Sequence, residues 1–87
     1  MQINNDYVVK EVLGSKVLIN LSDEANAIIK LNDTSFDIYN LLSRNKTKEE
    51  ILNYLIKEYD IDINTLEKDY DVLINDLINK GIIINEQ

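Results

Sequence analysis

The side chains with the greatest chemical potential in this sequence are carboxylates near residue 60. Asp60, Asp62 and Asn64 alternate as the first, third and fifth ligands of an EF-hand calcium loop do. The remaining ligand pattern is absent, because the sixth position is Thr65 where a glycine is needed and the twelfth is Asp71 where a glutamate is needed. The sequence therefore predicts no metal site here, and instead an acidic loop in which Asp62 or Asn64 caps the following helix.

A wider acidic cluster surrounds this loop and contains carboxylate pairs of the kind used in acid–base catalysis. It comprises Glu58, Asp60, Asp62, Glu67, Asp69, Asp71 and Asp76. The sequence has no histidine and no cysteine, which removes the commonest zinc ligands and the common activated nucleophiles. Nothing in the spacing of the cluster predicts a cleft. We expect a solvated surface, or one that attracts a basic peptide, with no catalytic residue and no cofactor.

Five tyrosines raise the question of stacking on nucleic-acid bases. Tyr39, Tyr59 and Tyr70 recur at helical spacing within apolar stripes, so the sequence predicts that they belong to the core. Tyr70 falls in the first half of the last predicted helix. We expect that half to face the third predicted strand across a groove.

Composition favours a binding module over an enzyme. The 87 residues are 45% hydrophobic and 29% charged, as expected of one folded domain spanning residues 1–87 with its core at about 7–84. A chain this short buries only about 60 to 65% of its unfolded surface, which leaves little room for an enclosed active site. The net charge of -7 disfavours nucleic-acid binding. No apolar run is long enough to span a bilayer, so we expect a cytoplasmic protein without membrane contact.

The elements that position these side chains begin with three strands. Residues 7–13 alternate loosely and are rich in valine, and residues 16–21 place Val17, Ile19 and Leu21 on one face. With Gly14-Ser15 between them, they predict a β-hairpin with its turn at that pair. Residues 27–31 follow a polar cluster and predict a third antiparallel strand. In such a meander the first and third strands are edges, with backbone groups unpaired on one side.

Three helices follow the strands. The first begins directly after the third strand, with Asn32 or Asp33 as its N-cap, and runs to about Ser43. Thr47 and Glu50 form a capping box at the start of the second. The third is expected over residues 64–80, with Gly81 ending it and residues 82–84 returning to the core as a short strand or extended tail. This order predicts an α+β winged helix-turn-helix domain, a three-stranded antiparallel sheet followed by three helices.

The chain resembles the PqqD family over about residues 7–84. The motifs that carry the resemblance are Leu31-Asn32-x-Thr34, Thr47-x-x-Glu50-Ile51, Glu58-Tyr59-Asp60-Ile61-Asp62 and Lys80-Gly81-Ile82. Ser35 and Phe36 depart from the family pattern, in which small residues often follow the threonine. The resemblance implies a small adaptor that binds the leader segment of a ribosomally made precursor peptide and presents it to a modification enzyme, such as a radical SAM enzyme or a leader peptidase.

The implied binding mode is addition of a strand along residues 27–31, beneath the third helix. The unpaired edge supplies main-chain hydrogen bonds, and the apolar flank of the helix supplies pockets rimmed by carboxylates. The expected peptide-binding residues are Ala27, Ile28, Ile29, Lys30, Leu31, Asp69, Tyr70, Leu73, Asp76 and Leu77.

Two other functions fit the size of the chain. A winged-helix DNA-binding regulator requires basic residues on one face, which Lys46, Lys48 and Lys57 provide only if folding gathers them. An acyl carrier protein is also small and acidic, but it is all-helical and modified at a serine that begins a helix. The surroundings of Ser35 and the three preceding strands disfavour that function.

Overall fold

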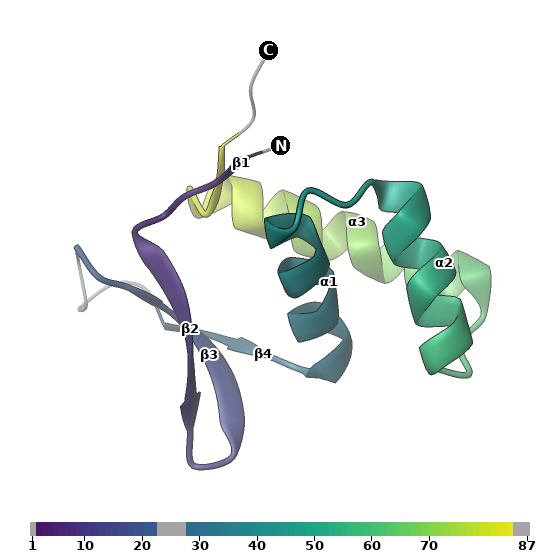
Figure 1. Cartoon of the computed structure of the whole chain (residues 1–87), viewed down its shortest axis with the longest axis horizontal. Coiled ribbons are helices and arrows are strands. Elements are labelled where there is room, and N and C mark those ends of the chain that lie inside the picture. Colours follow the sequence, from purple (N-terminus) through teal and green to yellow (C-terminus); the bar gives the residue numbers. More distant parts are fainter. Residues whose placement is uncertain (1, 23–27, 85–87) are drawn as a thin grey trace.

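The computed structural model describes residues 2–22 and 28–84, and it has helices on one side of a small sheet (Figure 1). Strands β2 (Tyr7–Val12), β3 (Ser15–Asn20) and β4 (Ile28–Leu31) form an antiparallel sheet in the order β2-β3-β4. Helices α1 (Asp33–Ser43), α2 (Lys48–Glu58) and α3 (Ile63–Asn79) follow. The predicted α+β arrangement of three strands followed by three helices is confirmed. None of the described helices is long and apolar enough to cross a membrane.

The turn of the β2–β3 hairpin lies one residue earlier than predicted. Val12 pairs with Ser15, so the two-residue loop is Leu13-Gly14 and not Gly14-Ser15. Both loop residues have positive φ, 52° at Leu13 and 81° at Gly14. Two positive φ angles are the mark of a type I′ turn, whose twist matches that of the strands. The prediction placed the turn at Gly14 and the residue after it, because glycine adopts positive φ most easily. In the structure the residue before Gly14, a leucine, adopts positive φ as well.

Leu13 lowers the stability of this turn, because its backbone is left-handed and its fully exposed side chain gains no packing in return. Leu13→Asn should stabilise the domain by about 0.5 to 1 kcal/mol, because asparagine tolerates this conformation better. Thermal unfolding checks this, and the expected rise in midpoint is roughly 2 to 6 °C. The matched control is Leu21→Asn, at an exposed leucine without positive φ, which should change little. An equal gain in both variants would show that lost surface leucine, not turn geometry, is responsible.

Strand β4 leads into α1 without a loop. Asn32 is the N-cap, as the sequence allowed, and its side-chain oxygen accepts a hydrogen bond from the Ser35 N–H at 2.7 Å. The described part of β4 begins at Ile28, so Ala27, expected in this strand, lies outside the described residues. The end of β4 at Leu31 is thus fixed by the first turn of α1.

The other helix ends follow their sequence signals. The predicted Thr47–Glu50 capping box is present. Asp62 caps α3 by accepting from two backbone N–H groups, so α3 begins at Ile63, one residue before the expected start. Beyond α3, Gly81 has a φ of 75°. The Ile82 N–H donates to the Leu77 carbonyl and the Gly81 N–H to the Ile78 carbonyl, which is a Schellman motif.

The two faces of the sheet have different neighbours. Val9, Leu18 and Ile29 lie opposite one another on adjacent strands, and all three belong to or pack against the core. The core is completed by residues of the three helices and the C-terminal segment, among them Ile38, Ile51, Leu55, Leu66, Leu77 and Ile82. The next row across the sheet is Lys10, Val17 and Lys30, which faces away from this core.

Two side-chain contacts fix α1 in place. The Lys16 ammonium lies 4.0 Å from the centre of the Phe36 ring, a cation–π contact between β3 and α1. The Tyr59 hydroxyl donates to the Asp37 carboxylate at 2.6 Å, joining the end of α2 to α1. This hydrogen bond, with desolvation and the Asp37 charge, raises the pKa of Tyr59 to about 12. Phe36, one of the two departures from the family pattern, thus contributes a contact between α1 and the sheet.

A second small sheet joins the ends of the chain. The predicted short C-terminal strand is β5 (Ile83–Ile84), and it pairs with β1 (Gln2–Ile3), which the sequence did not indicate. Ile83 is only 2% exposed. A strand of two residues carries too little alternation to be predicted from its own sequence.

Candidate functional site

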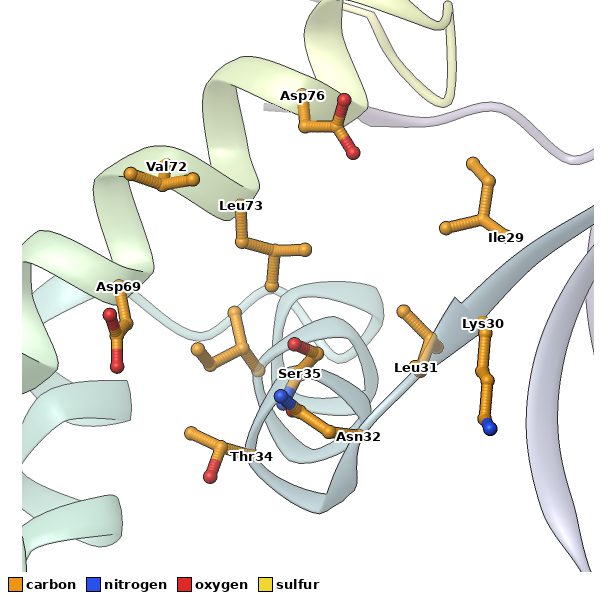
Figure 2. A pocket seen from close by; sticks show the side chains of 11 residues that line it. Ile29, Lys30, Leu31, Asn32, Thr34, Ser35, Asp69, Val72, Leu73 and Asp76 are labelled. Atoms are coloured by element: carbon orange, nitrogen blue, oxygen red, sulfur yellow. The ribbon is translucent and has the colours of Figure 1, made fainter.

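A groove of about 480 Å³ lies between β4 and α3, with the beginning of α1 as its floor (Figure 2). Residues of three elements, β4, α1 and α3, converge there. The residues that line it are Ile29, Lys30, Leu31, Asn32, Thr34, Ser35, Ile38, Asp69, Val72, Leu73 and Asp76.

One wall of the groove is an open sheet edge. Among the described residues, β4 has β3 on one side and no strand on the other. Alternate residues of an edge strand direct backbone N–H and C=O groups outward, where they need water or another strand as partner. Ile29 and Leu31 share the helix-facing side of β4, and Leu31 is 5% exposed. The edge therefore offers backbone hydrogen bonds beside an apolar surface.

The opposite wall is α3, with both apolar and acidic side chains. Leu73 extends toward β4 and is partly buried against the core, whereas Val72 is 62% exposed (Figure 2). Asp69 and Asp76 lie one turn to either side of this pair. These four positions share one flank of the helix, at spacings of three and four residues. An apolar centre with a carboxylate at each end is the result.

The two carboxylates differ in their charge environment. Asp76 forms an ion pair with Lys80, one turn later on the same helix. No basic side chain of the described residues is in salt-bridge range of Asp69, which is exposed. Asp69 is therefore the carboxylate of this groove that is available to a cation.

Tyr70 and Leu77, expected at the groove, lie in the core instead. They are 3% and 0% exposed, and neither lines the groove. The Tyr70 ring faces α2, with the Lys48 ammonium 5.4 Å from its centre. Its hydroxyl is buried and has no hydrogen-bond partner among the described residues, and burial raises its pKa. Tyr70 therefore belongs to the buried stripe of α3, as its helical spacing predicted, and not to the flank beside β4, where Asp69 lies.

Of the other expected site residues, the structure brings Ile29, Lys30, Leu31, Asp69, Leu73 and Asp76 to the groove. Ile28 is in β4, and Ala27 lies outside the described residues. Sequence reasoning missed Val72 and the start of α1. The spacing of Asp69, Val72 and Asp76 indicates a common helix flank, and it was available as a signal.

The acidic residues outside the groove do not form a second site among the described residues. Asp62 caps α3, which confirms the loop interpretation of residues 60–64. Asp71 and Glu67 lie 3.2 Å and 3.8 Å from the Lys48 ammonium. Within residues 2–22 and 28–84, no group of three or more His, Cys, Asp or Glu side chains is placed to hold a metal ion. The described acidic cluster is thus spread over a surface.

The charge of α3 also bears on DNA binding, since a winged helix reads DNA with this kind of helix. The helix carries four carboxylates and one lysine. Lys48, one of the lysines considered for a basic face, is held by two of those carboxylates. A surface of this charge repels a phosphate backbone.

The comparisons with known proteins identify the family and similar folds. The family described as coenzyme PQQ synthesis protein D (PqqD) matches residues 16–83. No curated protein shows significant sequence similarity to the chain. TbiB1, solved in complex with the TbiA(beta) leader peptide, is similar in structure, with a TM-score of 0.81, 26% identity, and coverage of 100% of this chain and 99% of that one. A lasso peptide synthetase B1 complexed with the leader peptide has the same fold, with a TM-score of 0.81, 20% identity, and coverage of 97% and 96%.

Proposed function

Since the chain belongs to the PqqD family, we propose that it binds the leader segment of a ribosomally made precursor peptide and presents it to a separate modification enzyme. The observation that carries the proposal is the open edge of β4 beside the apolar flank of α3. Both similar solved structures are complexes with leader peptides, which supports the same ligand here. The proposed role is that of an adaptor without catalysis of its own.

In the proposed binding mode the leader adds a fourth strand to the sheet. Its backbone pairs with β4, and its alternate side chains enter the groove against Leu73 and Val72. Backbone pairing supplies affinity that depends little on sequence, and the groove selects the side chains. Because such a strand has only five to seven residues and loses conformational freedom on binding, we expect a dissociation constant of roughly ten nanomolar to ten micromolar.

The proposed partner enzyme is a radical SAM enzyme, which would modify the part of the precursor beyond the leader, or a leader peptidase, which would cleave the leader from that part. An adaptor of this kind raises the local concentration of substrate at the enzyme. Because ribosomes make the precursor, we propose that the protein works in the cytoplasm. We also propose that residues 1–87 form a single domain that uses no cofactor or metal ion.

The two carboxylates of the groove should contribute unequally to binding. Asp69→Ala should weaken binding of a leader with a basic residue several-fold at low salt, mainly through the association rate. Asp76→Ala should have a smaller effect because Lys80 already compensates its charge. Both changes should alter the free energy of unfolding by no more than about 0.5 kcal/mol. Stopped-flow fluorescence at two salt concentrations measures the rates.

The control outside the groove is Asp71→Ala, which removes one negative charge from α3 and, like Asp76→Ala, leaves a lysine without its nearest ion-pair partner. If Asp71→Ala weakens binding as much as Asp69→Ala, only the net charge of the protein matters. If none of the three changes alters the affinity at low salt, the electrostatic part of the proposal is wrong and the groove binds through apolar and backbone contacts.

A further inference from the structure

Lys30 has a position in the sheet that bears on which leaders are accepted. Lys10, Val17 and Lys30 are opposite one another on β2, β3 and β4, so their side chains share the face away from the helices. Ile29 and Leu31, on either side of Lys30, have the opposite orientation, toward the groove. In Figure 2 the Lys30 side chain extends away from Leu73.

This outer row is positive on a chain of net charge -7. Lys10 and Lys30 are exposed, and neither has a salt-bridge partner among the described residues. The one acidic residue in the described strands, Glu11, pairs across the sheet with Lys16, whose ammonium lies over Phe36 on the helix-facing side. Lys30 is thus the uncompensated cation of the edge strand.

We infer, on the basis of the proposed function, that Lys30 selects leaders with an aspartate or glutamate between two apolar residues. A strand added to β4 extends the row by one residue, directly beside Lys30 and on the same outer face. The two neighbours of that residue face the groove, against Leu73 and Val72. The recognised pattern is therefore apolar–acidic–apolar, with the carboxylate paired to the Lys30 ammonium.

The same arrangement fixes the register of the bound strand. Slipping the peptide by one residue turns every side chain to the other face of the sheet. The peptide carboxylate then points toward Asp69 and Asp76, and an apolar side chain lies beside Lys30. The slipped register is therefore unfavourable for two reasons: the peptide carboxylate is repelled by the groove carboxylates, and Lys30 loses its partner. Lys30 is in this sense a specificity-determining residue of the β4 edge, on the face opposite the groove.

Selection from a library of randomised displayed peptides tests the inference and does not require the sequence of the leader. The wild type should enrich the apolar–acidic–apolar pattern, and Lys30→Glu should enrich lysine or arginine at the central position. Lys10→Glu is the matched control, because it changes the charge by the same amount in the same row but on the far strand. It should select as the wild type does.

Two synthetic peptides that differ only in a central glutamate or lysine then give the magnitude. The wild type should bind the glutamate peptide roughly three- to tenfold more tightly at low salt, and Lys30→Glu should reverse the order. If wild type and Lys30→Glu select the same central residue within a shared alternating pattern, the role of Lys30 is overturned while the proposed function stands. If neither selects an alternating pattern, the proposed binding mode, strand addition beside the groove, fails and this inference fails with it.

Discussion

Leu73→Asp is expected to weaken leader binding by at least about thirtyfold, corresponding to roughly 2 kcal/mol. Leu73 is the side chain of α3 that extends into the groove toward β4 (Figure 2). A bound strand would cover it, so the substitution removes apolar contact and places a carboxylate where water is excluded. Isothermal titration calorimetry with the leader peptide measures the loss.

Two further variants separate binding from folding, because Leu73 also packs partly on the core. Val72→Asp alters a more exposed groove residue and should weaken binding about tenfold with little loss of stability. Ile56→Asp makes the same chemical change on α2, outside the groove, and should leave affinity within about twofold. Folded Leu73→Asp and Val72→Asp proteins that both bind as tightly as the wild type would contradict the assignment of this groove as the binding site.

The second large effect concerns stability. Leu77→Ala is expected to lower the free energy of unfolding by about 2 to 5 kcal/mol, the usual cost of a cavity at a fully buried leucine. A domain of this size has a total of only about 5 to 10 kcal/mol, so the variant should be partly unfolded at moderate temperature. Denaturant unfolding followed by circular dichroism measures the change.

The same variant also tests whether Leu77 contacts the bound leader or only packs in the core. Once affinity is corrected for the folded fraction, Leu77→Ala should bind the leader within about threefold of the wild type, since Leu77 does not line the groove. A stable Leu77→Ala protein with strongly reduced affinity would restore the peptide-contact role expected from the sequence.

Local signals in the sequence were sufficient for most of the fold. Thr47, Asp62 and Gly81 mark helix ends through hydrogen bonds with residues close in the chain, so their positions follow from residue type and spacing. The Leu13-Gly14 turn departed from prediction because its register is set by pairing along the whole hairpin. The β1–β5 pair was missed because it joins two dipeptides from opposite ends of the chain.

The sequence predicted only some of the groove residues on α3. Periodicity identifies the apolar stripe of α3, but it does not indicate which flank of that stripe lies beside β4. Tyr70 and Leu77 are on the buried stripe, whereas Asp69 and Val72 are on the flank that faces the groove. That distinction depends on how α3 packs across α1 and the sheet, which involves contacts between residues far apart in the chain.

Strand addition to β4 is tested most directly by amide chemical-shift mapping of isotope-labelled protein during titration with the precursor leader. Addition of a strand to β4 predicts the largest shifts, together with slowed hydrogen exchange, at Ile28–Leu31, and further shifts at residues 69–76 of α3. The other edge of the sheet, β2, should be unaffected. Saturable shifts confined to Tyr7–Val12, with β4 and α3 unchanged, would contradict strand addition at β4.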